Sequence, residues 1–339
     1  MNHPIKILDC TLRDGGYVND FNFGADVIQK IINNLSESNV DLIELGFLKS
    51  QKFNVNKTIY HNIRAIYESF HIPSNSSKFC LMVRPDWYDI GNLEEQYGPI
   101  EILRIAFHAR DITKAIDYAT RAMSMGYKVV LNPVNVCAYT QTELEIILNR
   151  CLNFKPFGLT IVDTFGALTL NKFRQLLDVF NRDLPESIYL GIHLHDNLNL
   201  AMGLASIFID EIKDDRPVVI DSTLMGMGRP PGNLCTELIT NYYNSLNTHK
   251  YNIDTINFCI NDCIMPIRNS KSWGYHPAYA KTAFDLTHRD YAENLLKIFP
   301  SDYSRVYKLL TYLARDSKRI SFHQSVLNRL QELKKKDAL

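Results

Sequence analysis

The sequence lacks an excess of charge of either sign, because 37 Lys and Arg residues balance 37 Asp and Glu residues. A balanced chain has no overall field to attract nucleic acid or an anionic membrane surface, so we expect neither as a partner. Long apolar runs are also missing, and about 18 such residues in a row would be needed to span a membrane. The N-terminus has no positive segment leading into an apolar stretch and therefore predicts no signal peptide.

Paired cysteines are also lacking. The seven cysteines are odd in number and scattered, and the one close pair, Cys259 and Cys263, has neither zinc-site nor redox-motif spacing. Reduced thiols in a cytoplasmic protein are the simplest interpretation. The composition that remains, 46% hydrophobic and 22% charged, is ordinary for a globular protein with a large core.

Short apolar runs rich in β-branched residues alternate with segments of helical periodicity through the first two thirds of the chain. This alternation predicts βαβ units and a parallel sheet. Eight runs are found, which favours a closed (β/α)8 (TIM) barrel over an open sheet. Polar residues also follow several of the runs, where a barrel builds its active site. The runs are Ile5–Cys10, Val40–Phe47, Phe79–Arg84, Ile102–Phe107, Lys128–Asn132, Leu159–Val162, Tyr189–Leu194 and Val218–Ile220.

The alternation stops near residue 250. We therefore predict a barrel domain over residues 1–248 and a helical C-terminal extension over residues 249–339, packed on the barrel. Within the extension, Met265–Tyr275 is expected to be a loop, with Trp273 as a core anchor rather than part of a lid. The helices expected after it are Pro277–Leu286, Asp290–Phe299, Asp302–Ala314 and Ser321–Lys335.

His193 and His195 are the sharpest local feature. Successive side chains of a strand point to opposite faces, so the two imidazoles share one face while Ile192 and Leu194 point outward toward helices. Two imidazoles at a strand end are either a pair of metal ligands or two hydrogen-bonding rim residues.

One loop favours the metal interpretation, and a second loop indicates a possible binding site for the substrate. After the first strand, Arg13 and Asp14 precede two glycines, and the Asp14 carboxylate could supply an oxygen ligand or simply pair with Arg13. After the last strand, the loop containing Gly226 and Gly228 offers backbone N–H groups that could bind an anionic oxygen of a substrate. Any glycine-rich βα loop would look similar, so this second signal is weak by itself.

Together these segments resemble the metal-dependent barrel lyases (the HMG-CoA lyase-like or DRE-TIM metallolyases). That family shares a D-x-T-L-R-D-G opening, an H-x-H seventh strand and a G-x-G-x-x-x-G-N eighth loop, all present here. It includes 4-hydroxy-2-oxovalerate aldolase, 3-hydroxy-3-methylglutaryl-CoA lyase, isopropylmalate and homocitrate synthases, and carboxyltransferase domains. Segments 103–108 and 162–168 look most like the aldolase branch.

The resemblance implies that Asp14, His193 and His195 bind one Mn²⁺ or Mg²⁺ ion, because these positions match the family's motifs. Asn233 would be a fourth ligand if the chain follows the lyase branch. Oxygen and imidazole ligands suit several divalent ions, so the ligand set does not choose between the two metals.

The resemblance further implies that Arg13 steadies an enolate oxygen and that Thr164 helps to seat an α-keto acid. The aldolases place a histidine three residues after the metal-binding Asp, and this chain has Tyr17 there. A phenol with an ordinary pKa near 10 is a poorer base than an imidazole. Tyr17 is therefore either the acid/base or a substrate-binding residue, and His108 is the second candidate base.

The function expected from these observations is a class II aldolase or lyase that cleaves or forms a C–C bond of a 4-hydroxy-2-oxo acid through a pyruvate enolate. Its partners would be a keto acid and an aldehyde, and a homo-oligomer is compatible with the exposed helices. One alternative is a Claisen-type synthase joining an acyl-CoA to a keto acid, although Gly228-Arg229-Pro230 stands where those enzymes have G-E-R. The other is a catalytically inactive binding subunit.

Overall fold

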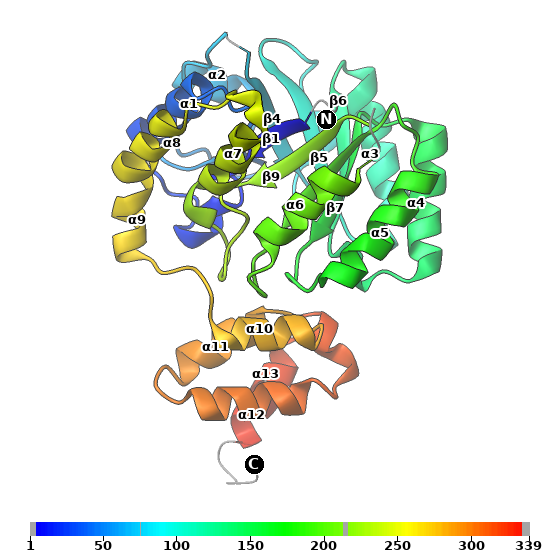
Figure 1. Cartoon of the computed structure of the whole chain (residues 1–339), viewed down its shortest axis with the longest axis vertical. Helices are drawn as coiled ribbons and strands as arrows, with labels where there is room; N and C mark the ends of the chain where they lie inside the picture. The colour runs from blue at the N-terminus through cyan, green and yellow to red at the C-terminus, as the bar shows by residue number, and fades with distance from the viewer. Residues whose placement is uncertain (1–4, 75, 213–215, 334–339) are drawn as a thin grey trace.

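Eight parallel strands close into a barrel in the computed structural model, which describes residues 5–74, 76–212 and 216–333 (Figure 1). Pairing of the first two strands completes the ring, and a short extra strand, β3 (Ile59–Tyr60), lies outside it beside β2. The predicted TIM barrel is confirmed, and each predicted run overlaps one strand. The barrel strands are β1 (Ile5–Asp9), β2 (Leu42–Leu48), β4 (Lys78–Val83), β5 (Ile100–Phe107), β6 (Lys128–Pro133), β7 (Gly158–Asp163), β8 (Tyr189–Leu194) and β9 (Val218–Ser222).

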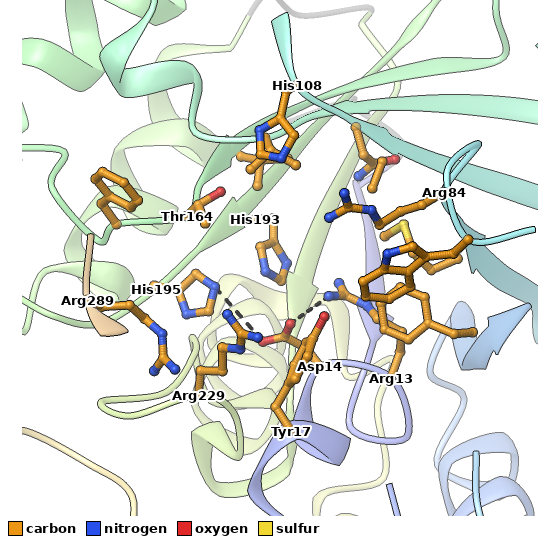
Figure 2. Close-up of a pocket in the computed structure, with 18 of the residues that line it drawn as sticks. Arg13, Asp14, Tyr17, Arg84, His108, Thr164, His193, His195, Arg229 and Arg289 are labelled. Carbon is orange, nitrogen blue, oxygen red and sulfur yellow. Dashed lines mark hydrogen bonds and ion pairs between the residues drawn. The ribbon is translucent and has the colours of Figure 1, made fainter. Parts of the chain in front are cut away.

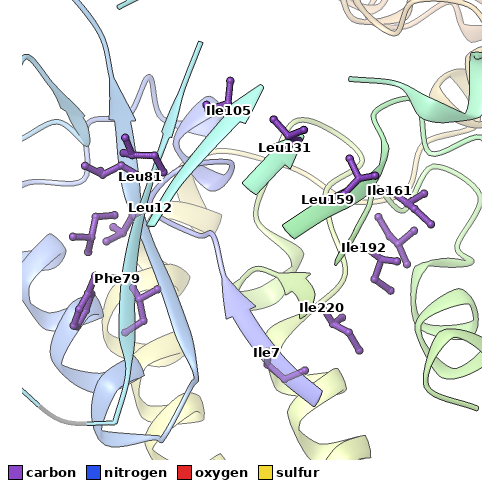
Figure 3. Packing of buried hydrophobic residues seen from close by; sticks show 14 of the residues in the cluster. Ile7, Leu12, Phe79, Leu81, Ile105, Leu131, Leu159, Ile161, Ile192 and Ile220 are labelled. Atoms are coloured by element: carbon purple, nitrogen blue, oxygen red, sulfur yellow. The ribbon is translucent and has the colours of Figure 1, made fainter. Parts of the chain in front are cut away.

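Helices surround the barrel and cover the outward side chains of its strands. Alternate residues such as Ile7, Ile105 and Ile192 are fully or almost fully buried beneath these helices (Figure 3). Burial both beneath the helices and inside the barrel explains why the strands read as nearly continuous apolar runs. The helices are α1 (Ala25–Glu37), α2 (Arg64–Ser69), α3 (Ile112–Ser124), α4 (Gln141–Phe154), α5 (Leu170–Asp183), α6 (Ala201–Glu211) and α7 (Thr236–Tyr243).

The barrel interior is layered. An apolar cluster that includes Leu8, Leu42 and Ile102 fills its N-terminal end. Above this cluster lie the buried charged side chains of Glu44 and Arg104. Glu44 is the third residue of β2, and its carboxylate points into the barrel, where it accepts a hydrogen bond from Arg13.

Beyond residue 250 the chain first stays on the barrel. Helix α8 (Ile253–Cys259) packs against α1, and α9 (Met265–Ser270) follows after one π-helical turn. The expectation of a loop over Met265–Tyr275 was wrong for its first six residues. Pro266 lies in the first turn of α9, where its missing N–H group costs no hydrogen bond.

A second set of helices has its own apolar core and lies against the barrel mouth (Figure 1). Asn197 Nδ2 donates to the Tyr279 carbonyl oxygen at 3.3 Å, and Phe165 and Ala283 share a small apolar cluster across the junction. We call α10–α13 the bundle. Its four helices confirm the predicted ones within the described residues: α10 (Pro277–Phe284), α11 (Asp290–Ile298), α12 (Tyr303–Leu313) and α13 (Gln324–Leu333).

Trp273 anchors the connection between α9 and the bundle. Its indole is buried and donates to the Met225 carbonyl oxygen at 2.9 Å, as expected of a core anchor. Trp273 belongs to the predicted extension, yet its side chain is part of the buried cluster of the barrel. The domain boundary after residue 248 therefore stays a prediction. The described residues do not include residues 1–4, on which the expectation about a signal peptide partly rests. They also do not include the end of the last predicted helix. Among the helices described, we find none long and apolar enough for a membrane span.

Gly46 gives the first test of this fold. Its φ is +147°, and an added Cβ would lie 2.1 Å from the Thr58 carbonyl oxygen. We expect Gly46→Ala to lower the free energy of unfolding by about 2 kcal/mol or more in urea denaturation. The control is Gly203→Ala in helix α6, where nothing lies within 4 Å, and alanine should raise stability there by about 0.5–1 kcal/mol. Equal stability of the two variants would contradict the close approach.

Candidate metal centre

Asp14, His193 and His195 meet at the C-terminal mouth of the barrel (Figure 2). One ligand atom from each lies within 4.8 Å of the others. The two histidines come from the end of β8. The Asp14 N–H group donates to the Cys10 carbonyl oxygen at 2.7 Å, and this turn brings the carboxylate over the barrel. The structure thus brings together the three side chains that the sequence analysis predicted as metal ligands.

Hydrogen bonds orient both imidazoles. His193 Nδ1 lies 3.0 Å from Asp221 Oδ2, and His195 Nδ1 lies 3.2 Å from the Gly232 carbonyl oxygen. This leaves each Nε2 for the site, and that of His195 is 3.9 Å from Asp14 Oδ2. Burial lowers the pKa of His195 to about 3, against the opposing effect of Asp14, so the imidazole is neutral as a metal ligand must be.

Asn233 adds an oxygen beside this group. Its Nδ2 donates to Asp14 Oδ2 at 2.7 Å, while its Oδ1 is buried and has no hydrogen-bond partner among the described residues. A buried acceptor without a donor is unfavourable, and a cation would satisfy it. The residues present therefore fit a divalent ion, with Asn233 available as a fourth ligand.

Gly226 and Gly228 shape the loop that holds Asn233. An added Cβ at Gly228 would lie 2.2 Å from Asn233 Nδ2, and one at Gly226 would lie 2.7 Å from the Asn233 carbonyl oxygen. Neither glycine is among the residues lining the cavity described below. Their predicted contact with substrate remains a prediction, and the structure gives both a role in backbone packing.

Buried charges of alternating sign connect Asp14 to His193 beneath the site. Arg13 donates from Nη1 to Asp14 Oδ1 and from Nε to Glu44 Oε2, both at 2.6 Å. Arg104 Nη1 lies 3.1 Å from the same Glu44 oxygen, and Arg104 Nη2 donates to Asp221. We call Asp14, Arg13, Glu44, Arg104 and Asp221 the charge chain.

The charge chain keeps its carboxylates ionised. Burial by itself would raise the pKa of Asp14, but Arg13 and the two histidines hold that pKa well below its ordinary value. The pKa of Asp221 is likewise lowered, because Arg104 outweighs the effect of burial. Three carboxylates thus face two guanidinium groups, and the excess negative charge favours a bound cation.

Cys10, His193 and Asp221 form a second group with ligand-like spacing. Asp221 there is already paired with Arg104, and burial raises the pKa of the Cys10 thiol well above its ordinary value. A neutral thiol beside a guanidinium group is a poor cation site. The first group is therefore the better candidate.

A cavity of about 250 Å³ opens beside the metal group. The sequence-predicted residues Arg13, Tyr17, His108 and Thr164 all line it (Figure 2). The Thr164 hydroxyl accepts a hydrogen bond from the Asn135 N–H group at 2.9 Å, which leaves its own proton to donate. Lining residues that sequence reasoning did not assign to the site include Arg84, Trp87, Arg229, His288 and Arg289.

The two candidate bases differ in their protonation. Burial raises the pKa of the Tyr17 phenol, although the nearby Arg229 opposes this shift. Burial together with Arg84 and Arg110 lowers the pKa of His108 from its ordinary value of 6.5. At neutral pH Tyr17 is therefore a proton donor, and His108 is a neutral imidazole that can accept a proton.

Asp221→Asn tests the charge chain. The change removes the carboxylate that orients His193 and leaves Arg104 without that counter-charge, so we expect Mn²⁺ affinity to fall about 10–100-fold. Isothermal titration calorimetry gives the affinity, and circular dichroism shows that each protein is folded. Asp183→Asn removes a carboxylate that pairs with Arg182 at the surface and should bind Mn²⁺ as the unmodified chain does. An unchanged affinity in Asp221→Asn would contradict the orienting role.

Comparison with known proteins agrees with this geometry. Residues 103–260 match the HMGL-like family. The chain is 23% identical to an oxaloacetate decarboxylase of Mycobacterium tuberculosis (69% of this chain, 68% of the relative). It is 26% identical to a 4-hydroxy-2-oxovalerate aldolase of Thermomicrobium roseum (70% and 65%) and 24% identical to a homocitrate synthase of Pyrococcus abyssi (84% and 77%). The matched regions thus span about two thirds of the first two relatives.

A solved structure resembles the chain over most of its length. The N-terminal domain of a candidate aldolase from Bacteroides vulgatus is 25% identical, with a TM-score of 0.75, and the match covers 89% of this chain and 99% of that one. The sequence match, the relatives and the barrel fold agree with one another. Residues 103–260 of the chain thus resemble the HMGL-like family, and the relatives found here include lyases and synthases.

Proposed function

We propose that this protein is a divalent-metal-dependent aldolase or lyase that cleaves or forms the C3–C4 bond of a 4-hydroxy-2-oxo acid. The observation that carries the proposal is the metal-ligand group of Asp14, His193 and His195 beside Arg13, at the wall of a small-molecule cavity. The 4-hydroxy-2-oxovalerate aldolases among the relatives support the substrate class.

A divalent ion bound by these residues supplies positive charge that polarises the keto oxygen and carboxylate of the substrate. Arg13 is fixed by Glu44 and Asp14 and presents a preorganised cation where the enolate develops negative charge. The Thr164 hydroxyl, which accepts from the Asn135 N–H group, would donate its own proton in a hydrogen bond to the keto acid.

Proton transfer is assigned to His108 and Tyr17. In the cleavage direction, neutral His108 takes the proton of the 4-hydroxyl group, the C3–C4 bond breaks, and its electron pair forms the pyruvate enolate as the aldehyde leaves. Tyr17 stays protonated and hydrogen-bonds to the substrate. The proton held by His108 then moves to C3 of the enolate and gives pyruvate, and the reverse sequence condenses pyruvate with an aldehyde.

Deuterium exchange tests the enolate without knowledge of the aldehyde. We expect the protein with Mn²⁺ to exchange the methyl protons of pyruvate in D₂O, followed by proton NMR after chelation of the metal. His193→Gln should lower the exchange rate at least about 100-fold, because the substitution removes a proposed metal ligand. If the unmodified protein binds Mn²⁺ and catalyses no exchange, the pyruvate-enolate proposal is wrong.

The assignment of the base can be tested by comparing two variants. We expect His108→Gln to lower kcat for aldol cleavage by about 10²–10⁴-fold, as loss of a general base does, and Tyr17→Phe by about tenfold. Because the pKa of His108 lies below 6.5, the rate should hold from pH 8 to pH 7 and fall only at lower pH. A larger loss in Tyr17→Phe than in His108→Gln would reverse the two roles.

The homocitrate synthase relative supports a second candidate, a synthase joining acetyl-CoA to a keto acid. The two reactions differ in one product, since only the synthase releases a thiol. Thiol release from acetyl-CoA in the presence of keto acids, with no aldehyde consumed, would favour the synthase over the aldolase.

A further inference from the structure

One wall of the cavity carries positive charge that the proposed aldol reaction does not use. Arg229 lies in the loop after β9, and Arg289 directly precedes α11 of the bundle. Figure 2 shows Arg229 between Tyr17 and Arg289. Its guanidinium carbon lies 4.1 Å from the centroid of the Tyr17 ring. Arg229 therefore lies near the metal group, on the side that faces the bundle.

Arg289 is held beside it by the barrel. Its Nη1 donates to the Pro230 carbonyl oxygen at 3.0 Å, and its Nη2 donates to Glu293 at 2.7 Å. The side chain is buried, and its Nε has no hydrogen-bond partner among the described residues. Burial lowers the pKa of Arg289, and the positive charge of Arg229 lowers it further. The two guanidinium groups thus repel each other, and an anion between them would relieve that repulsion.

Most other charges that line the cavity already have partners. Asp14 is the single carboxylate among the described lining residues, and it is paired with Arg13. Arg84 forms two hydrogen bonds to Asp86. Arg289 is paired with Asp290 and Glu293. Arg229 has no hydrogen bond or carboxylate partner among the described residues, which leaves its positive charge uncompensated.

The positive charge of Arg229 stays uncompensated when the metal ion and a keto acid are bound. The charge chain has an excess of one negative charge, so a divalent ion leaves one positive charge there. The carboxylate of the keto acid neutralises that charge. Arg229 still lacks a counter-ion, and a neutral aldehyde such as acetaldehyde would not supply one.

We propose that the aldehyde half of the substrate carries a second anionic group, a carboxylate or a phosphate, which binds between Arg229 and Arg289. This inference rests on the proposed aldol function and names its acceptor class. Arginine suits this role because its planar group donates two parallel hydrogen bonds to a carboxylate or phosphate. The full substrate is then a 4-hydroxy-2-oxo acid with an anion at its far end, and the bundle contributes to its recognition.

Two matched pairs of aldehydes test the proposal. Succinic semialdehyde is compared with butanal, and D-glyceraldehyde 3-phosphate with D-glyceraldehyde, in aldol addition to pyruvate with Mn²⁺. We expect kcat/KM for at least one anionic aldehyde to exceed that of its neutral partner by about 100-fold, as one or two charge-assisted hydrogen bonds allow. The pair that shows the preference identifies the anion as carboxylate or phosphate. Equal use of both members of both pairs would overturn the proposal.

Arg229→Gln assigns the preference to the residue. The ratio of kcat/KM between the charged and neutral aldehydes should fall at least about tenfold, and Arg229→Lys should keep part of it. The ratio cancels any effect common to both substrates. The control is Arg110→Gln, which removes an exposed positive charge near the barrel mouth that does not line the cavity, and its ratio should stay unchanged. A ratio that survives in Arg229→Gln would overturn the assignment.

Pyruvate exchange separates this proposal from the aldol reaction. If exchange occurs and no anionic aldehyde is preferred, the anion site is wrong and the pyruvate enolate stands. If exchange is absent, the aldol proposal fails, and calorimetric titration with inorganic phosphate tests the site directly. Phosphate binding that Arg229→Gln weakens about tenfold or more would then support the anion site, and absence of binding would overturn it.

Discussion

The Glu44 carboxylate lies at the centre of the barrel and is shared by Arg13 and Arg104. Through these two arginines it is connected to Asp14 on one side and to Asp221 and His193 on the other. Burying five charged groups carries a large desolvation cost, which is offset only when each group keeps its partners. The position of each member therefore depends on the others, and the two metal-ligand elements, the loop after β1 and the end of β8, are held in one geometry.

The same arrangement accounts for the choice of ligand. The charge chain ends in a carboxylate at each side and has one more negative than positive charge. Neutral histidines and the unpartnered Asn233 oxygen complete a donor set of nitrogen and oxygen atoms. Such a set suits a divalent cation of intermediate hardness. An apolar plug below the charged layer keeps water from the N-terminal end of the barrel, which strengthens these interactions.

The sequence predicted the parts that depend on local pattern. The eight apolar runs gave the barrel, and alternation along β8 placed His193 and His195 on the inner face with Leu194 in the outer core. Helix α9 was expected to be a loop, because Pro266 resembles a helix breaker when its place in the first turn is unknown.

The pairing of Arg229 with Arg289 at the cavity wall could not have been predicted from local pattern. Arg229 is one arginine in a Gly/Pro-rich loop, and Arg289 directly precedes a predicted helix, 60 positions further along the chain. Their approach depends on how the bundle packs on the barrel, which no local period encodes. That four arginines line a single cavity becomes visible only once the three-dimensional contacts are known.

The loop after β9 joins the two sides of the cavity. Three hydrogen bonds hold this loop. Trp273 donates to the Met225 carbonyl oxygen, and Arg289 donates to the Pro230 carbonyl oxygen. The Leu234 N–H group donates to the Leu194 carbonyl oxygen. Between these points Asn233 contacts Asp14, and Arg229 faces the cavity. A shift of the bundle would therefore move this loop, and with it both the residue that contacts the metal ligand Asp14 and the proposed anion-binding residue Arg229. The extension, remote in sequence from the charge chain, is in this way coupled to the geometry of the site it covers.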